Sequence, residues 1–402
     1  MLLPINTLVK INMSFVKVFI STVKDEIRAI FCDAGAMLIL VFAMLIYTVI
    51  YSVAYGKEVV TDVAIGVVDE DNTQSSQRLI DGIRSGPNTM VAYEPVSMAD
   101  AEELFYDGDI YGVVYIPSRY EQRLLSGRQA NAGVVLDGSH LLLYRQVLEQ
   151  AAADILTQGA GVEVSRLMAS GVDVSFIKGI VEPVIYDSHT LYNPTLGYGS
   201  FVMPTIVVVI IQQTALIGIA LIAVRRRLRG EMYVAKTICR ATTDVLAKIL
   251  VYTILYGVNL TIILGVIWPI FGFPNVGRTQ DVALLMLIYC IAVISLSLTI
   301  SHLFRRRETP IIVLLWCSVP VLLLAGLSYP KEAFPSWLYA LGELLPSSSA
   351  VRAFVDIGTM GASLVDVTGE LYMLLFLAVG YLLTAIITEK LDVINKKNGL
   401  SV

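Results

Sequence analysis

The sequence predicts a mainly α-helical integral membrane protein with six transmembrane helices and an inserted extracytoplasmic α/β domain. The 402 residues are 56% apolar and only 16% charged, with a mean hydropathy of +0.71, whereas soluble domains are about 25% charged. Six apolar runs are long enough to cross a hydrocarbon layer of about 30 Å as helices. Between the first two runs, residues 56–195 alternate strand-like and helix-like patterns.

The six apolar runs define the predicted spans. They are Ala34–Tyr55, Leu196–Val224, Ile249–Phe271, Val282–Phe304, Ile311–Tyr329 and Leu371–Thr388. The first run is too long for the apolar core of a cleaved signal peptide and has no A-x-A site after it, so we interpret it as an uncleaved anchor. Residues 3–30, within the N-terminal segment 1–33, alternate apolar clusters with four basic residues. This pattern favours an amphipathic helix on the inner membrane surface over a solvated tail.

Basic residues predict the orientation of the spans. The segments 1–33, 225–248, 305–310 and 389–402 together hold 17 of the 29 Lys and Arg residues. The clusters "RRRLR" (Arg225–Arg229) and "RRR" (Arg305–Arg307) lie directly at span ends, where the positive-inside bias is strongest. We therefore predict that both termini are cytoplasmic and that residues 56–195 are extracytoplasmic. That domain contains none of the four cysteines, and its length is sufficient for a core without disulfides.

Local patterns predict the elements of the extracytoplasmic domain. Strands are expected at 62–69, 89–94, 110–117 and 131–137, and helices at 72–86, 97–109, 118–127 and from 139 onward. Asn72 and Thr73 have the character of a helix cap, and Ser97 with Asp100 forms an acidic variant of the capping box. The alternation of strands and helices predicts at least some parallel strand pairing.

Motifs of catalysis and nucleotide binding are absent from the sequence. It contains no G-x-x-x-x-G-K-[ST], H-E-x-x-H, C-x-x-C or G-x-S-x-G, so ATP is not expected to bind this chain through a phosphate loop. His140, His189 and His302 have no histidine or cysteine at ligand spacing, so no metal site is expected. The acidic stretch "DEDNTQ" (Asp69–Gln74) lacks the EF-hand pattern and is interpreted as a turn that caps the next helix.

Ionisable residues are almost absent from the predicted spans, which argues against an intramembrane enzyme or an ion relay. The polar residues that remain are mild, namely Gln212, Gln213, Asn259, Ser295, Thr299 and His302. These residues could line a substrate path. The alternative is that they form interhelical hydrogen bonds, each worth about 0.6 kcal/mol.

Two connecting segments are unusual for a membrane protein. The segment 225–248 has about two dozen residues, although a few would suffice to connect two spans. Its length fits either a partner-docking helix or a basic flank followed by a helix extension. Its polar residues are Arg229, Gly230, Glu231, Lys236, Arg240, Asp244 and Lys248. The segment 330–352 combines prolines, charges and apolar side chains, so it is neither a polar loop nor a regular span. Its marker residues are Pro330, Pro335, Trp337, Pro346 and Arg352. The expected carboxylate partners of Arg352 are Glu343 and Asp356, the latter four residues on at helical spacing.

Three stretches together resemble the membrane subunit of type-2 ABC exporters. They are "YNPTLGYGSFVMP" (Tyr192–Pro204), "RGEMYVAKTICRATTDVLAKIL" (229–250) and a proline-rich signature from Gly326 to Arg352 that includes Trp337, Leu338, Leu345 and Pro346. The order of one span, a large outside domain and five further spans is also similar. The sequence departs from the family pattern at Glu231-Met232, where Gly-Thr is common, and at the "SSSA" before Arg352.

The resemblance implies a permease of the bacterial inner membrane, from the branch similar to multidrug-type efflux permeases. Residues 225–248 and the N-terminal helix would then contact a separate cytoplasmic ATPase, which binds ATP and Mg²⁺. Residues 330–352 would form re-entrant helices at an outer gate. The implied partners are a second permease copy or a close relative, and a periplasmic adaptor with an outer-membrane channel.

We therefore predict the permease subunit of an ATP-driven exporter for a hydrophobic or amphipathic substrate, itself without catalytic residues, cofactor or metal. The alternative from another class is a membrane-anchored envelope receptor or assembly factor without transport activity. Co-purification of an ATPase whose hydrolysis the chain alters would distinguish the two.

Overall fold

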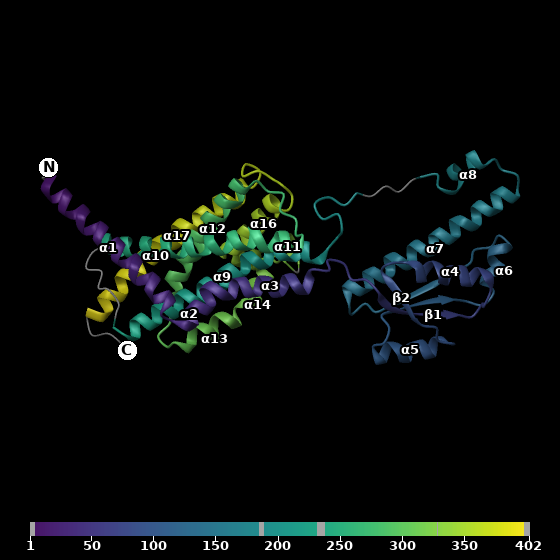
Figure 1. The fold of residues 1–402 in the computed structure, drawn as a ribbon, viewed down its shortest axis with the longest axis horizontal. Coiled ribbons are helices and arrows are strands. Elements are labelled where there is room, and N and C mark those ends of the chain that lie inside the picture. Colours follow the sequence, from purple (N-terminus) through teal and green to yellow (C-terminus); the bar gives the residue numbers. More distant parts are fainter. Residues whose placement is uncertain (1–4, 185–188, 231–237, 328, 398–402) are drawn as a thin grey trace. The chain divides into compact units, whose positions relative to one another are not determined.

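The computed structural model describes residues 5–184, 189–230, 238–327 and 329–397. The chain forms two compact units, both drawn in Figure 1. The helical unit comprises Met1–Glu58 and Thr190–Val402, and the α/β unit comprises Val59–His189.

The α/β unit is built on a four-stranded mixed sheet. Its elements are β1 (Val63–Asp69), α4 (Gln74–Ser85), β2 (Thr89–Tyr93), α5 (Met98–Asp107), β3 (Gly112–Ile116), α6 (Tyr120–Leu125), β4 (Gly133–Leu136), α7 (Leu141–Ala169) and α8 (Val174–Val181). The strand order is β2-β1-β3-β4. Strand β1 pairs in parallel with β2 and β3, and β4 runs antiparallel to β3. The predicted strands and helices, and the predicted parallel pairing, are therefore confirmed.

Helices cover both faces of this sheet. Helices α4 and α7 lie on one face and α5 lies on the other (Figure 1). Ile65 and Val67 pack in the core with α4 and α7, while Val68 packs with Ala101 of α5. Burial on both faces explains why β1 is a continuous apolar run and does not alternate with polar residues.

Local capping signals of the α/β unit form as the sequence predicts. Thr73 and Ser76 make a reciprocal capping box at the start of α4, and Ser97 and Asp100 make one at the start of α5. In the predicted acidic turn, Asp69 Oδ1 accepts hydrogen bonds from the backbone N–H groups of the second and third residues after it, both at 3.0 Å. The "DEDNTQ" stretch is thus a capping turn between β1 and α4.

The helical unit is a bundle of long apolar helices with shorter connecting helices. Its elements are α1 (Ile5–Phe31), α2 (Ala34–Met37), η1 (Leu38–Ala43), α3 (Met44–Tyr55), α9 (Tyr198–Leu228), α10 (Ile238–Ile262), η2 (Ile263–Ile267), α11 (Trp268–Phe271), α12 (Thr279–Ser301), α13 (Glu308–Trp316), α14 (Ser318–Leu324), η3 (Lys331–Ala333), α15 (Ser336–Glu343), α16 (Pro346–Gly358) and α17 (Thr368–Lys397). The start of α1 and the end of α17 lie at one end of the bundle, and α11 lies towards the other (Figure 1).

Five stretches of the described residues are helices long and apolar enough to cross a membrane. They are Ala34–Tyr55, Tyr198–Leu228, Ile238–Phe271, Thr279–Ser301 and Thr368–Leu391. The second of these is 78% buried inside the unit, so α9 forms its centre. Several spans are longer than their apolar runs, because α9, α10 and α17 continue as helix through charged residues that hydropathy excludes.

The predicted single span Ile311–Tyr329 differs from the structure. The chain there forms two shorter apolar helices, α13 and α14, which together run only from Glu308 to Leu324. Pro320 explains the break at Cys317, because proline lacks an N–H group and its ring clashes with the carbonyl four residues earlier. Gly326 then adopts a left-handed φ of +86° just past the end of α14, a conformation that commonly ends helices.

The chain enters α9 through a hydrogen-bonded clamp. The backbone N–H of Tyr198 donates to the carbonyl of Glu58 at 2.8 Å. The Glu58 carboxylate accepts from the Ser200 N–H at 3.0 Å and from its hydroxyl at 2.8 Å. A carboxylate beside the first turn satisfies free N–H groups and complements the helix dipole. The clamp thereby fixes the start of α9 against the end of α3.

Candidate functional site

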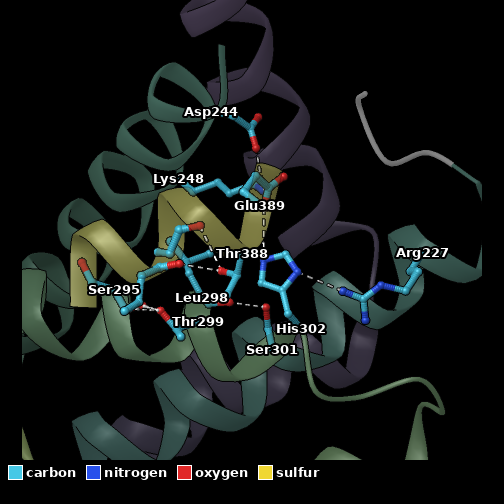
Figure 2. Close-up of polar contacts among 12 residues, drawn as sticks. Arg227, Asp244, Lys248, Ser295, Leu298, Thr299, Ser301, His302, Thr388 and Glu389 are labelled. Atoms are coloured by element: carbon cyan, nitrogen blue, oxygen red, sulfur yellow. Dashed lines mark hydrogen bonds and ion pairs between the residues drawn. The ribbon is translucent and has the colours of Figure 1, made fainter. Parts of the chain in front are cut away.

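A charge network crosses the end of the helical unit where α9 ends and α10 begins (Figure 2). Its members are Asp244 and Lys248 on α10, Glu389 on α17, His302 at the end of α12 and Arg227 on α9. The Lys248 ammonium lies 2.6 Å from Asp244 Oδ2 and 3.3 Å from Glu389 Oε1. The second Glu389 oxygen lies 3.3 Å from His302 Nε2, and Arg227 Nη2 lies 3.4 Å from His302 Nδ1. Polar contacts therefore connect four long helices.

Helix α1 makes one polar contact with this charge network and two more beside it. The Thr22 hydroxyl donates to Asp244 Oδ1 at 3.0 Å. One turn further along α1, Glu26 lies 2.5 Å from Arg226 Nη1 of α9 and accepts a hydrogen bond from the Tyr252 hydroxyl of α10. The described part of α1 is thus held on the bundle by ionic and hydrogen-bonding contacts.

A second set of ion pairs surrounds the carboxylate of Asp33, at the junction of α1 and α2. Asp33 caps α2 by accepting hydrogen bonds from the N–H groups of Gly35 and Ala36 at 3.0 and 3.2 Å. The same carboxylate lies 3.3 Å from Arg225 Nη1 and 2.7 Å from Arg307 Nη2. The two predicted arginine clusters, at the end of α9 and before α13, therefore converge on one buried aspartate.

Sequence reasoning singled out Asp244, Lys248 and His302 but missed the ion-pair networks that join them to other helices. Glu389, Asp244 and Glu26 are at most 9% exposed, and charges so deeply buried persist only when paired and hydrogen-bonded. Hydropathy ends the last span at Thr388, one residue before Glu389, so the sequence shows a carboxylate at a span end and not inside a bundle. The available signal was the i,i+4 pair Asp244 and Lys248, since residues at this spacing share a helix face.

The predicted coupling residues fall into three groups. Arg229 and Gly230 are exposed at the end of α9, where Gly230 has a φ of +69°. Arg240 is half-buried in the first turn of α10, whereas Asp244 and Lys248 point into the charge network. Glu231 and Lys236 lie outside the described residues. The predicted segment 225–248 therefore includes the end of α9 and the first turns of α10. Within it, Asp244 and Lys248 are held inside the bundle.

The predicted outer segment is a broken helical hairpin. Pro335 immediately precedes α15, and Pro346 is the first residue of α16, where a missing N–H costs no hydrogen bond. Side chains on α15 such as Trp337 are exposed. Pro330 is exposed before η3, and the first turns of α16 are buried.

The turn between α15 and α16 reaches the middle of the bundle. The Ser347 N–H donates to Gln212 Oε1 at 3.0 Å, near the midpoint of α9. The Tyr381 hydroxyl donates to the Leu344 carbonyl at 2.6 Å, near the midpoint of α17. Residues 344–347 therefore lie about halfway along two long helices, α9 and α17.

An ion cluster holds this hairpin together. Arg352 donates to both oxygens of Glu343, at 2.7 and 3.2 Å, and its Nε lies 3.5 Å from Glu370 of α17. Lys331 Nζ lies 3.6 Å from Glu343 Oε1. Of the two predicted partners of Arg352, Glu343 is therefore the one in contact, and Asp356 is not among its ion pairs in the described part of the chain.

The electrostatics of the cluster follow from burial and neighbouring charges. Burial and the nearby Arg352 guanidinium lower the pKa of Lys331 to about 8. The pKa of Glu343 is lowered because hydrogen bonds and charge from Arg352 outweigh the opposing effect of burial. Burial also raises the pKa of Asp356. The hairpin thus contains one cation that is costly to keep charged.

The predicted path residues make interhelical contacts or lack partners. Asn259 Nδ2 donates to the Leu40 carbonyl at 3.2 Å, and the Thr299 hydroxyl lies 3.0 Å from that of Thr384. By contrast, buried side-chain atoms without a hydrogen-bond partner among the described residues include Gln212 Nε2, both polar atoms of Gln213, and the hydroxyls of Ser295 and Ser347. Ser347 belongs to the α15–α16 turn, and Gln212 contacts it. Buried polar atoms without partners are uncommon and call for an explanation such as water or a ligand.

Comparison with known proteins agrees with this architecture. A family model described as "ABC-2 family transporter protein" matches residues 35–387. A protein of Escherichia coli strain K12 named "Probable multidrug ABC transporter permease YbhR" is 24% identical over 343 residues, which cover 83% of this chain and 87% of that protein. The protein of the same name from Escherichia coli O157:H7 shows the same identity and coverage.

Proposed function

This chain belongs to the ABC-2 family of transporter proteins as a multi-pass permease subunit, and from that premise we propose that it forms the membrane path of an ATP-driven exporter. The substrate is a hydrophobic or amphipathic molecule, drug-like or lipid-like, taken from the cytoplasm or the inner membrane. The observation that carries the proposal is the family match, which spans both the loop 225–248 and the outer segment 330–352.

A separate cytoplasmic ATPase supplies the energy by binding and hydrolysing ATP with Mg²⁺. It contacts the loop 225–248 and the N-terminal helix. The position of α10 supports this role, because its first turns lie within this segment and its Lys248 is paired with Glu389 of α17. A movement of the loop would therefore be transmitted to several helices together, as in a two-state transporter.

The broken hairpin α15–α16 acts as the outer gate. Non-helical backbone at membrane depth is tolerated where other helices cover it or where it lines a cavity. The contacts of its turn with Gln212 and Tyr381 support this assignment. The buried polar atoms of Gln212, Gln213 and Ser295 that lack partners among the described residues are then positions for water or substrate.

Six crossings are proposed, with α13 and α14 together as the fifth. Their 17 residues from Glu308 to Leu324 span about 25 Å as helix, somewhat less than the hydrocarbon layer of about 30 Å. A bilayer accommodates such a mismatch by local thinning. Both termini are then cytoplasmic and the α/β unit is extracytoplasmic, in the inner membrane of a bacterium.

A second permease copy or a close relative completes the path, as the resemblance to type-2 ABC exporters implies. The name of the Escherichia coli relative, a probable multidrug permease, supports a drug-like substrate. The extracytoplasmic α/β unit is then available to a periplasmic adaptor that leads to an outer-membrane channel.

Affinity purification of the tagged chain from its native membranes tests the proposal. We expect an ABC ATPase to co-purify, and its hydrolysis rate to change when the complex is reconstituted and supplied with amphipathic drugs. Deletion of the chain should reduce efflux of the same compounds from cells. Purification without any ATPase, together with unchanged efflux, would contradict export and favour an envelope receptor or assembly factor.

A further inference from the structure

A cavity of about 500 Å³ opens beside the charge network. Its lining comes from α1, α9, α10, α12 with the residue after it, and α17. Its volume falls within the range of about 300–1,000 Å³ that is usual for small-ligand sites. It lies at the end of the bundle that carries the arginine clusters.

The cavity wall carries an excess of positive charge. Its strongly basic residues are Arg28, Arg225, Arg226, Arg227, Arg229 and Lys248, against the acidic Asp25, Glu26, Asp244 and Glu389. Three of these acids are already engaged, Glu26 with Arg226 and the other two with Lys248. Arg225 shares its partner Asp33 with Arg307. Arg227 and Arg229 have partners as well, so the capacity for a further anion lies with Arg28 and with the shared Arg225.

Arg28 is the clearest available donor. Its side chain is exposed on α1, and it makes no ion pair with any residue that the structure describes. A guanidinium offers several N–H donors in a planar fork that fits the oxygens of a phosphate. Arg225 lines the same cavity and donates to the carbonyl of Ala29, the residue after Arg28, at 3.4 Å. The two arginines give the cavity the donor chemistry of a phosphate site.

Another part of the wall is apolar. Ile219, Ile222 and Ala223 of α9 and Leu298 of α12 contribute to the lining. A ligand with an apolar portion fits this part of the wall better than a purely ionic ligand. Basic pockets between membrane helices on the cytoplasmic side are a known setting for anionic lipid headgroups.

We propose that this cavity binds a phosphate-bearing anionic amphiphile, with the phosphate at Arg28 and Arg225 and an apolar portion against α9 and α12. The inference goes beyond the proposed export function and does not require it. The binding experiment uses the permease alone and has no transport step, so a negative result would leave that function untouched.

The test is calorimetric titration of the purified full-length chain in neutral detergent. Dioctanoyl phosphatidylglycerol, which is anionic, is compared with dioctanoyl phosphatidylcholine, which carries the same phosphate without net charge. We expect tighter binding of the anionic lipid. Arg28→Gln should weaken that binding about five-fold, as expected for one basic residue near a charged headgroup, whereas Arg28→Lys should keep most of it.

Arg306→Gln is the matched control, because Arg306 is exposed and belongs to the second arginine cluster but does not line the cavity. Its binding should equal that of the unchanged protein. Inorganic phosphate at equal concentration separates the two sources of a phosphate group, and we expect it to leave the lipid bound. Equal affinity for both lipids, or an equal loss in Arg306→Gln, would overturn the proposed site. Full displacement by inorganic phosphate would show that a soluble phosphate, and not an amphiphile, is recognised.

Discussion

Lys331 is the residue at which burial and charge conflict most clearly. Its side chain packs against the backbone near Gly326 and is only 5% exposed. Its Nζ has a carboxylate at 3.6 Å but no hydrogen-bond partner among the described residues. A buried ammonium in this situation loses hydration that one distant ion pair restores only in part. The consequence is a pKa of about 8, below the ordinary value of 10.5.

Stability is therefore expected to rise with pH in the alkaline range. Below about pH 8 Lys331 is charged in both states, so the folded protein carries the full penalty. Between about pH 8 and 10.5 the folded state has lost the proton that the unfolded chain keeps, so the penalty disappears with rising pH. This interval corresponds to roughly 3 kcal/mol.

Lys331→Met tests this expectation through thermal unfolding of the purified chain at several pH values. The variant should be more stable than the unchanged protein at pH 7, and the difference should shrink towards pH 10.5. Lys178→Met is the control, because Lys178 lies in α8 of the other unit. A constant difference across this range would show that Lys331 does not titrate within it.

Arg352 gives a second prediction at the residue scale. Its guanidinium and the Glu343 carboxylate are 25% and 15% exposed, so the pair is neither fully buried nor solvated. Removal of one partner of a buried pair costs about 3–5 kcal/mol, and exposed pairs contribute about 0–1 kcal/mol. Since Lys331 remains near Glu343, we expect Arg352→Ala to cost about 2 kcal/mol of unfolding free energy.

A double-mutant comparison isolates this pair. Arg352→Ala combined with Glu343→Ala should lose less than the two single losses together, because the second change removes the stranded carboxylate. Arg145→Ala provides the control, since its pair with Glu149 is about half exposed on both sides and should be worth under about 1 kcal/mol. Equal small losses at both arginines would mean that the hairpin is an ordinary surface loop.

The charged residues also show what the sequence could reveal at this scale. Residue type and spacing predicted that Arg352 needs a partner and offered Glu343 and Asp356 as choices. The choice between them depends on how α15 folds back along α16, which is a tertiary feature. Glu389 gave no signal of its own, because one carboxylate after an apolar run looks the same whether it enters water or a bundle.

At the scale of elements, local signals were sufficient in the α/β unit. Alternating patterns and capping residues such as Thr73 and Ser97 depend only on residues close in the sequence. The strands and helices that they predict are present in the structure. The helical unit was harder, because hydropathy measures the lipid-facing part of a helix and not its full length. Pro320 is a local signal for the break between α13 and α14, but the apolar residues around it predict a continuous span.

One element contact lies outside any local signal. The stretch η1 is π-helical from Leu38 to Ala43, and the fully buried Leu40 lies directly over Gly218 of α9. A Cβ atom at residue 218 would overlap the Leu40 side chain. The carbonyl of Leu40 also accepts the hydrogen bond from Asn259. The first span is thereby fixed to α9 and α10 at one position.

Gly218→Ala is expected to separate η1 from α9 and to destabilise the protein by about 1–3 kcal/mol, the usual cost of overpacking. Gly257→Ala is the matched control, because Gly257 is also helical but has open space where the Cβ would lie. That change should be neutral or slightly stabilising, since alanine favours helix more than glycine does. Thermal unfolding of both variants in detergent distinguishes the outcomes, and similar midpoints would contradict the close contact.

At the scale of the whole molecule, the chain leaves the helical unit after Glu58 and returns at Thr190. The clamp between Glu58 and Ser200 joins the two crossing points, so the α/β unit is inserted without interrupting the bundle. Composition and span order predicted this insertion. The number of crossings is a finer question, because it depends on whether the 17 residues of α13 and α14 traverse the bilayer.

The last prediction concerns whether α13 and α14 together cross the membrane. If α13 and α14 cross, the segments before and after them lie on opposite sides; if they do not, both lie on the same side. Three exposed positions report this, namely Ser126 in the α/β unit, Arg306 before α13 and Val365 before α17. The native cysteines Cys32, Cys239 and Cys317 are exposed and are first replaced by serine, and the buried Cys290 is replaced by alanine.

Single cysteines are then introduced as Ser126→Cys, Arg306→Cys and Val365→Cys and treated with an impermeant thiol reagent in intact spheroplasts. We expect the positions 126 and 365 to react at once and the position 306 to react only after lysis. The reason is that the arginine cluster before α13 belongs on the cytoplasmic side, and a crossing by α13 and α14 then brings residue 365 outside. Reaction of 306 and 365 from the same side would show that this helix pair turns back within the membrane, which would place the C-terminus outside and exclude an outer gate at residues 330–352. Reaction of 306 without lysis, with 126 protected, would instead reverse the orientation of the whole chain.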